Sequence, residues 1–325
     1  MHDVFVAGEL IVDLHPDGAG SLATAEGFSK RPGGAPANVA VGLARLDRTP
    51  AFWTRVGDDP FGDFLVDVVT DEGVPATHVR RDERAKTGLA FVGRRADADR
   101  EFELYLDDAA STRLDPDAIP EDALAAAEWV HVGGVELSSE PARSATFELA
   151  ERAAETGATV SFDPNARPEL WTDFDYADAL DRMLDLADVV KISAEDLSRA
   201  GIDADDAAGL VASVQSRGPH TVFLTQGAAG AHAVASAAAP WGSATVDHDG
   251  HAVDAVDTTG AGDAFTAGAV AALVDGASLT EAVADASAVA ALTTTAEGAM
   301  TALPTRAELT AFRDDSGSDG SSGDG

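Results

Sequence analysis

A short glycine-rich turn between two aspartates is the part of the sequence that best suggests chemistry. It reads DTTGAGDAFTAG over residues 257–268, and an alanine-rich apolar run follows it. Gly260 and Gly262 allow backbone conformations closed to other residues and let a ligand approach the main chain. The first N–H groups of a following helix are unpaired and carry partial positive charge, so this turn suits a phosphate or a developing oxyanion.

Asp263 falls in the first turn of the predicted helix, one residue beyond those amides. A base beside a bound phosphoryl group is what an enzyme that phosphorylates an alcohol requires. The same residues also fit a plain strand-to-helix turn with an acidic first helical turn, since short motifs often match by chance. The sequence contains no P-loop pattern, and no GxGxxG opens the first β-α unit, which argues against an N-terminal dinucleotide-binding half.

A second glycine-rich segment lies near the N-terminus. It reads RPGGAPANVAVGLARL over residues 31–46. Gly33 and Gly34 precede an amphipathic helix that Pro36 and Asn38 are expected to start. Taken alone, this segment is equally well explained as a capped helix.

The segments around these motifs alternate between strand and helix. Nearly continuous apolar, β-branched runs predict buried strands at 4–8, 129–134, 159–163, 188–193 and 221–227. Apolar residues at helical spacing predict helices over 61–69, 141–156, 175–186 and 205–216. This alternation predicts an α/β fold with a central, mostly parallel sheet covered by helices on both faces.

Residues 87–106 break the alternation. They read as two strands around a polar turn, because Phe102, Leu104 and Leu106 alternate with polar neighbours. Residues 10–32 are also extended and glycine-rich, so the two segments together predict a small sheet projecting from the main domain. The tail at 313–325 is almost wholly Gly, Ser and Asp and is predicted to be disordered.

The composition limits the partners of the chain. Its 325 residues include 57 Asp and Glu against 22 Lys and Arg, which gives a net charge of −35. Mutual repulsion opposes compact folding in dilute buffer, whereas at about 1 M salt the Debye length falls to roughly 3 Å. We therefore predict a cytoplasmic protein of a high-salt organism that binds neither nucleic acid nor a membrane. Cysteine is absent, and the first residues show no signal-peptide pattern, so neither disulfides nor a leader are expected.

Taken together, the two glycine-rich segments resemble the paired signatures of the ribokinase-like (PfkB) carbohydrate kinases, and the wording is closest to the fructokinase branch. Other stretches resemble the family at matching places: GELIVDLHP, VGDDPFGDFL, FDPNARPELW, ADVVKISAEDL and LTQGAAGA. The resemblance implies a ribokinase-like three-layer α/β fold, with a single domain over 1–312. The lid of that domain would be formed by about 13–35 and 86–108.

The resemblance also implies an activity. The γ-phosphoryl group of ATP would pass to a primary hydroxyl of a sugar, in the first instance fructose, with Mg²⁺ as a cofactor and K⁺ as a further candidate. Two alternatives stay open, namely a 2-keto-3-deoxygluconate kinase and a non-catalytic regulator that binds a sugar or nucleotide on the same fold. A homodimer through the lid is also open.

Positions in the matching motifs carry implied roles. Asp263 would be the general base, and the amides of Gly260, Ala261 and Gly262 would hold the phosphates and the transition-state charge. The implied sugar contacts are Asp13, Gly33, Gly34, Asn38 and Arg167.

The implied nucleotide contacts are Asn165, Thr225, Gly227 and Gly230, together with Gly262. Asp257 is a candidate ligand for a monovalent cation. Asp196 stands where many relatives carry a glutamate linked to magnesium, and Ser193 stands in place of an asparagine. Because the shorter carboxylate reaches less far, helix capping is favoured over a direct magnesium contact for Asp196.

Two departures affect the sugar pocket as the family builds it. Leu106 stands where fructokinases commonly have arginine, and Ser111 stands where an aspartate is common. Both changes weaken the case for fructose in particular, but not the case for a sugar hydroxyl as the acceptor.

Overall fold

The computed structural model describes residues 2–18, 21–94, 100–171 and 175–318. Within these residues nine strands form one sheet in the order β13-β12-β11-β10-β9-β8-β1-β4-β5. The strands from β11 to β5 pair in parallel, and β12 and β13 add antiparallel pairs at one edge. Their bounds are β1 (Val4–Ala7), β4 (Ala51–Gly57), β5 (Val79–Asp82), β8 (Trp129–Gly133), β9 (Thr159–Asp163), β10 (Val189–Ser193), β11 (Thr221–Thr225), β12 (Ala231–Ala235) and β13 (Ala244–His248).

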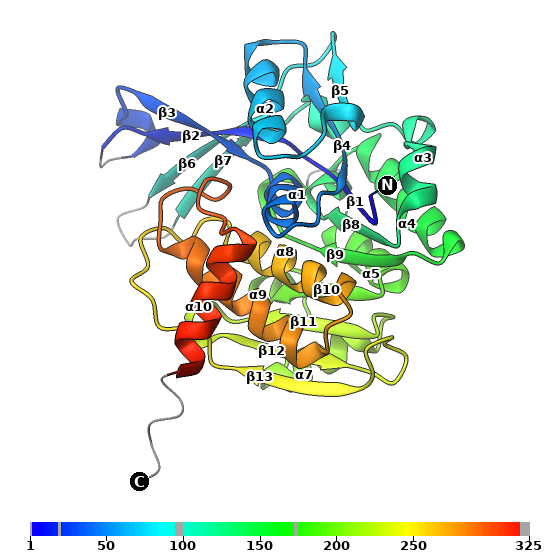
Figure 1. Cartoon of the computed structure of the whole chain (residues 1–325). Helices are drawn as coiled ribbons and strands as arrows, with labels where there is room; N and C mark the ends of the chain where they lie inside the picture. The colour runs from blue at the N-terminus through cyan, green and yellow to red at the C-terminus, as the bar shows by residue number, and fades with distance from the viewer. Residues whose placement is uncertain (1, 19–20, 95–99, 172–174, 319–325) are drawn as a thin grey trace.

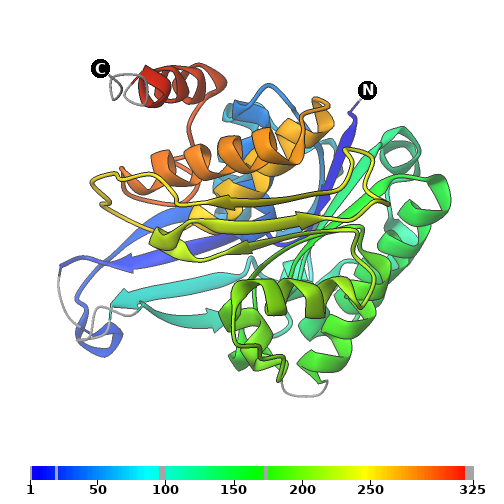
Figure 2. The ribbon, with the colours of Figure 1, turned by 90° about the horizontal axis from the view of Figure 1, so that it is seen from below.

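Helices cover both faces of this sheet, which Figure 2 shows from below. One face carries α1 (Ala35–Arg45), α2 (Pro60–Asp71), α8 (Ala261–Val274) and α9 (Leu279–Thr294), with α10 (Arg306–Ser318) outside α9. The other carries α3 (Glu121–Ala126), α4 (Ala142–Thr156), α5 (Tyr176–Leu186), α6 (Ala194–Arg199) and α7 (Ala207–Gln215). The predicted three-layer α/β arrangement is confirmed.

Two hydrophobic cores follow from the alternation of side chains along each strand. In β1, Val4 and Val6 pack into the core under α1 and α8, while Phe5 and Ala7 pack into the core under α4. Burial on both faces explains why these strands read as continuous apolar runs.

A second, four-stranded sheet projects from the central one (Figure 1). Its order is β3-β2-β6-β7, with β2 (Ile11–Pro16), β3 (Phe28–Gly33), β6 (Leu89–Arg94) and β7 (Arg100–Tyr105). The small sheet predicted from the two extended segments is therefore confirmed, and we call it the lid sheet. Residues 95–99, the polar turn between its last two strands, lie outside the described residues.

The start of α1 differs from the prediction that Asn38 opens the helix. The helix begins at Ala35, and the amide of Asn38 already donates to the carbonyl of Gly34 at 2.9 Å. Gly34, with φ of 106°, is the N-cap and has no side chain to cap with. The carboxylate of Glu9 does so from outside, because its Oε1 accepts from the Ala35 amide at 2.8 Å. Asn38 is thereby free to point its side chain elsewhere.

The C-terminal segment also differs from the prediction in part. Residues 313–318 continue α10 instead of beginning a disordered tail, and Arg313 forms an ion pair with Asp285 of α9. Residues 319–325 lie outside the described residues. In the described part of the chain, no helix combines the length and apolar character that crossing a bilayer requires.

Candidate active site

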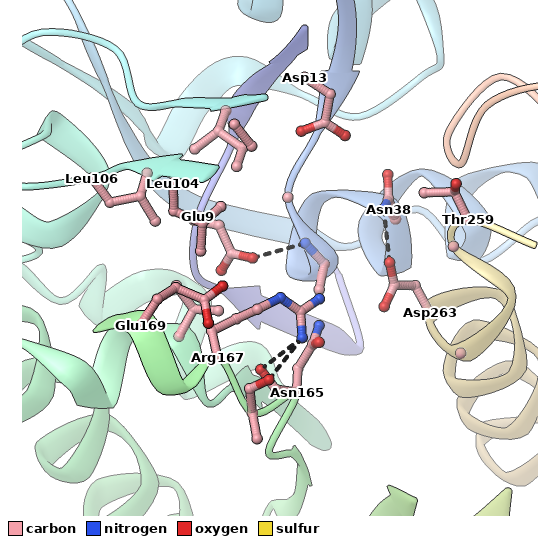
Figure 3. A pocket seen from close by; sticks show the side chains of 18 of the residues that line it. Glu9, Asp13, Asn38, Leu104, Leu106, Asn165, Arg167, Glu169, Thr259 and Asp263 are labelled. Carbon is pink, nitrogen blue, oxygen red and sulfur yellow. Dashed lines mark hydrogen bonds between the residues drawn. The ribbon is translucent and has the colours of Figure 1, made fainter. Parts of the chain in front are cut away.

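A cavity of about 790 Å³ lies between the lid sheet and the carboxyl ends of β1, β9 and β10. The carboxyl ends of parallel strands are where open α/β sheets bind their ligands. The lid contributes Asp13 and Leu104 to its lining, and α1 and α8 contribute Asn38 and Asp263 (Figure 3). Every sequence-predicted sugar contact except Gly33 therefore lines one cavity, and Gly33 lies directly beside it, against Asp13.

Asp263 projects into this cavity from the first turn of α8. Its Oδ2 accepts a hydrogen bond from Asn38 Nδ2 at 2.7 Å. Burial raises the pKa of Asp263 to about 7; the charges of Asp163 and Glu9 act in the same direction, while the Asn38 hydrogen bond opposes them. A carboxylate that titrates near neutral pH can both take up and release a proton in the working range of an enzyme.

The glycine turn before α8 has the conformation that the motif predicts. Gly260 is the N-cap with φ of 77°, and the first α-helical bond joins the Ala264 amide to its carbonyl at 2.8 Å. The amide of Ala261 turns back to the carbonyl of Thr258 at 3.4 Å. Gly262 lies in the first turn of α8, where amides have no partner within the helix, so its amide can meet an anion at this helix end.

Lys191 is a candidate site residue that the sequence analysis missed. Its Nζ donates to Asp163 Oδ2 at 3.1 Å and lies against Gly262, where an added Cβ would come within 2.8 Å of Nζ. Burial lowers the pKa of Lys191, but the nearby carboxylates of Asp163, Asp196 and Asp263 outweigh it and raise the pKa overall. The ammonium therefore stays charged beside the turn. The available signal was a lysine within the otherwise apolar strand DVVKIS.

Asp13 is enclosed by the lid. A Cβ on Gly33 would lie 2.4 Å from atoms of its carboxylate, so glycine at that position makes room for the acid. Burial raises the pKa of Asp13 to about 7, the charges of Asp263 and Glu9 add to this, and Arg167 and Arg31 oppose it. An aspartate in this place can accept hydrogen bonds from sugar hydroxyls.

Arg167 lines the cavity opposite α1 (Figure 3). Its Nη1 donates to the carbonyls of Asn165 and Ala166, at 3.3 and 3.0 Å, so the guanidinium is held by its own loop. Asn165, whose φ is 40°, lines the same cavity. These contacts fix a positive group in the lining of a pocket in which acidic side chains outnumber basic ones.

Two buried glutamates form a second feature that sequence reasoning missed. Glu9 and Glu136 are 3% and 2% exposed, and one oxygen of each has no hydrogen-bonding partner in the described part of the protein. Burial raises the pKa of both carboxyls, and for Glu9 the charge of Glu136 raises it further. Ionising both carboxyls together is therefore unfavourable in this buried place.

Besides the acidic Asp13 and Glu103, the lid side of the cavity carries an apolar wall. Leu106 is 3% exposed and stands where the fructokinase pattern has arginine. The nearby Ser111 is buried, and its Oγ has no hydrogen-bonding partner among the residues that the structure describes. The wall consists of Ile11, Ala90, Leu104, Leu106 and Val135. Such a surface packs against the C–H face of a sugar and offers no charge.

A second cavity of about 270 Å³ adjoins the first on the other side of the glycine turn. Thr225, Gly227 and Gly230 line it, as predicted for nucleotide contacts, while Asn165 does not. Its remaining lining is mainly apolar, with Phe265, Ala290 and Val253 among the contributors. Gly262 lines both cavities, so a molecule in each would meet at this residue.

The two candidate metal ligands are occupied by protein donors. Asp196 accepts from the amide and hydroxyl of Ser193 and from the amide of Ala166, which makes it a helix cap. Asp257 accepts from the amide and hydroxyl of Thr259 and from the amide of Gly298. No group of three or more His, Asp or Glu side chains in the described ranges is arranged to hold a metal ion.

Comparison with known proteins gives consistent matches over nearly the whole chain. The profile of a family described as pfkB family carbohydrate kinase matches residues 1–306. A fructokinase of Klebsiella pneumoniae is 42% identical over 315 residues, which cover 94% of this chain and 97% of that protein. A fructokinase of Salmonella typhimurium is 38% identical and covers 94% of this chain and 97% of its own.

Solved structures agree with these matches. A fructokinase of Vibrio cholerae with fructose, ADP and a calcium ion has a TM-score of 0.84 at 35% identity, covering 96% of this chain and 99% of that one. A fructokinase of Xylella fastidiosa with bound ATP has a TM-score of 0.85 at 31% identity, covering 98% of this chain and all of its own (100%).

Proposed function

Because this chain belongs to the pfkB family of carbohydrate kinases, we propose that it is a fructokinase with ATP as the phosphoryl donor. One observation carries the proposal: Asp263 stands in the cavity of about 790 Å³ under the lid sheet, beside a glycine turn that also lines a second cavity. The Vibrio cholerae relative, whose structure holds fructose and ADP, supports a site that takes both a sugar and a nucleotide.

The reaction that this geometry supports is in-line phosphoryl transfer. Asp263 accepts the proton of the primary hydroxyl as its oxygen forms a bond to the γ-phosphorus, and the bond from that phosphorus to the β-phosphate oxygen breaks to release ADP. The amide of Gly262 and the ammonium of Lys191 stabilise the charge that develops on the transferred group. Mg²⁺ bound with the nucleotide would further neutralise charge on the phosphates, and Lys191 and the amide of Gly262 are the groups of this chain that would share that task.

The charges around the cavity favour an uncharged sugar over the sugar acid 2-keto-3-deoxygluconate. A carboxylate in the substrate would face an excess of like charge, and the ammonium of Lys191 is already paired with Asp163. The lining contains three basic residues, Arg167, Lys191 and Arg199, against six acidic ones, Glu9, Asp13, Glu103, Glu169, Glu195 and Asp263. The alternative of a non-catalytic regulator is disfavoured because such a protein has no need of a base at Asp263.

A substrate panel tests this proposal. Fructose, 2-keto-3-deoxygluconate, ribose, glucose and adenosine are offered with Mg-ATP in concentrated KCl, and ADP release is measured. Fructose should give the highest kcat/KM. A higher kcat/KM for 2-keto-3-deoxygluconate would show that the sugar acid, and not fructose, is the preferred substrate. If no sugar is phosphorylated, the proposed kinase activity is refuted.

K⁺ is proposed as an activator near Asp257, whose carboxylate joins the glycine turn to the loop at 297–299. Comparing K⁺ with a bulky organic cation at equal ionic strength separates a specific activation from general screening. Equal rates in both salts would exclude it.

A homodimer through the lid sheet is proposed from its outer face. Phe28, Phe91 and Tyr105 form edge-to-face contacts across three strands, at centroid distances of 5.2 and 5.3 Å. Phe28 and Tyr105 are 37% and 59% exposed, so this aromatic cluster is accessible to a second copy of the chain. Sedimentation of the wild type and of Tyr105→Lys tests this; a monomeric wild type would refute it.

We propose a cytoplasmic location, where ATP is available to a kinase, and a salt-rich cytoplasm because of the net charge of −35. The salt dependence that this requires is a prediction for the molecule as a whole.

A further inference from the structure

Arg31 connects the lid sheet to a loop on the other side of the cavity. It lies in lid strand β3, and its Nη2 donates to Glu297 Oε2 at 2.7 Å, while its Nη1 lies 4.0 Å from Asp257 Oδ2. Asp257 precedes α8 and Glu297 follows α9, so both partners belong to the part of the chain that shapes the glycine turn. The guanidinium of Arg31 therefore connects the lid sheet to the chain segments on either side of α8 and α9.

The loop that Arg31 reaches is packed onto the glycine turn. Asp257 accepts from the amide of Gly298 at 3.0 Å and from the amide of Thr259 at 3.1 Å. A Cβ on Gly260 would lie 2.5 Å from the Cβ of Ala299, so the two backbones touch. A displacement of the loop at 297–299 therefore displaces the turn that meets the phosphates.

On its other side Arg31 neighbours Asp13, which lines the first cavity. Arg31 in β3 stands opposite Asp13 in the register of β2 and β3, and its positive charge lowers the pKa of the Asp13 carboxyl. Asp13 lines the sugar cavity, so anything that orders β2 and β3 also orders Arg31.

We propose that Arg31 is a positioning residue that couples sugar binding to nucleotide binding. The identity of the two ligands rests on the proposed function. A sugar that holds the lid strands in place holds Arg31 against the loop, which keeps the glycine turn ready for the nucleotide. By linkage, the nucleotide must raise the affinity for the sugar by the same factor. Because Arg31 and Glu297 are 27% and 71% exposed, we expect that factor to be modest, about two- to five-fold.

Titration calorimetry measures this factor directly. The Kd of fructose is determined with and without a non-hydrolysable ATP analogue and Mg²⁺, at fixed KCl concentration. In the wild type the analogue should lower the Kd about two- to five-fold. In Arg31→Ala the analogue should leave it unchanged, and Arg31→Lys should restore part of the effect, since an ammonium can still pair with Glu297.

Lys30 provides the matched control. It is the neighbouring residue on β3, but its ammonium lies over the ring of Phe64 at 3.7 Å and points away from the loop. Lys30→Ala removes the same charge from the same strand and should keep the wild-type coupling. Glu297→Gln should abolish the coupling as Arg31→Ala does, and the double variant should be no worse than either single one.

The results separate the two proposals. If the wild type shows no coupling, or if Arg31→Ala behaves like Lys30→Ala, the role of Arg31 is refuted while the fructokinase assignment stands. If the wild type does not bind fructose, the proposed fructokinase activity is refuted. The role of Arg31 is then tested by hydrogen exchange with the ATP analogue alone. Protection of β3 amides by the analogue in the wild type but not in Arg31→Ala supports the coupling; equal protection in both refutes it.

Discussion

At the scale of single residues, the chemistry of Asp263 is set by what surrounds it. Asn38 orients the carboxylate through one hydrogen bond, and burial keeps its affinity for a proton high. Asp13 lines the same cavity and has a similar pKa, but it belongs to strand β2 of the lid sheet, whereas Asp263 belongs to α8, the helix that follows the glycine turn. The two acids should therefore fail in different ways when they are changed.

Asp263→Asn should lower kcat by about 10²–10⁴ while the KM for fructose changes little, because the amide cannot accept the proton. Asp13→Asn should instead raise the KM for fructose and leave the KM for ATP unchanged. Steady-state kinetics with each substrate varied in turn distinguishes the two patterns. If Asp263→Asn retained wild-type kcat, Asp263 could not be the base.

The pH dependence follows from the same pKa. The base must be deprotonated to act, so kcat/KM should rise as the pH increases through about 7 and then level off. The plateau should begin well above the pH at which an ordinary aspartate is fully ionised. If kcat/KM stays constant from pH 5 to 8, the pKa of the catalytic base is not raised by burial.

The effect on stability has the opposite sign. A folded-state pKa raised to about 7 from 3.8 means that the native protein binds more protons than the unfolded chain between these pH values. Stability from this group is then complete below pH 3.8 and is lost as the pH rises through about 7. Asp263→Asn should therefore unfold at a higher temperature than the wild type at pH 8 by a few degrees, and the gain should shrink at pH 5. Thermal unfolding followed by circular dichroism at both pH values checks this.

Site residues that lie within one motif could be predicted from the sequence. Residues that become neighbours only through the pairing register of two strands could not. Asp263, Gly260 and Gly262 are neighbours in the chain, so their contacts are local. Lys191 reaches Asp163 only because β9 and β10 pair in parallel with Val190 opposite Phe162. Nothing in a single sequence specifies that register.

At the scale of elements, the glycine turn and α8 act as one unit. Gly260 combines a left-handed backbone with close contact to Ala299, and both restrict what can stand there. Gly276, just beyond the end of α8, has a similar φ of 84° but nothing within 4 Å of an added Cβ. The two glycines therefore separate backbone strain from steric exclusion.

Gly260→Ala should lower kcat and raise the KM for ATP, since the new Cβ pushes the loop at 297–299 and the turn apart. Gly276→Ala should cost only the strain of a left-handed alanine, about 1–2 kcal/mol of stability, with kinetics unchanged. Kinetics and urea denaturation of both variants make the comparison. Equal losses of activity in the two would mean that strain alone, and not the contact with Ala299, matters at the turn.

Element types were more predictable than element ends. The five predicted strands are buried on both faces, so their nearly continuous apolar runs identify them in the sequence. The run AHAVA of β12 is rich in alanine, which does not favour a strand, and β12 was not predicted. The start of α1 was misplaced because its cap comes from Glu9, a residue distant in sequence. The lid was recognisable because Leu104 and Leu106 alternate with polar neighbours.

At the scale of the whole molecule, net charge governs the environment in which the fold can exist. Only 22 basic residues face 57 acidic ones, and several arginines are shared between carboxylates, as Arg48 is between Asp3 and Asp275. Repulsion over the remaining surface is long-ranged in dilute buffer and is screened by salt.

Both the midpoint of thermal unfolding and the activity should therefore rise as KCl is increased from about 0.05 M to about 2 M. Circular dichroism melts and initial rates over this range test the prediction. Full activity and an unchanged midpoint in the most dilute buffer would contradict the proposed salt-rich habitat.

The position of Gly262, with one cavity on each side of it, also bears on inhibition. A single compound in which a ketose is joined to adenosine through a chain of phosphates could occupy both chambers at once. Its second half would then bind at the high effective concentration that the tether imposes, so its affinity should exceed that of either half by orders of magnitude, about 10²–10⁴-fold. Because one residue, Gly262, lines both cavities, a ligand that joins the two proposed substrates needs only a short link between its halves.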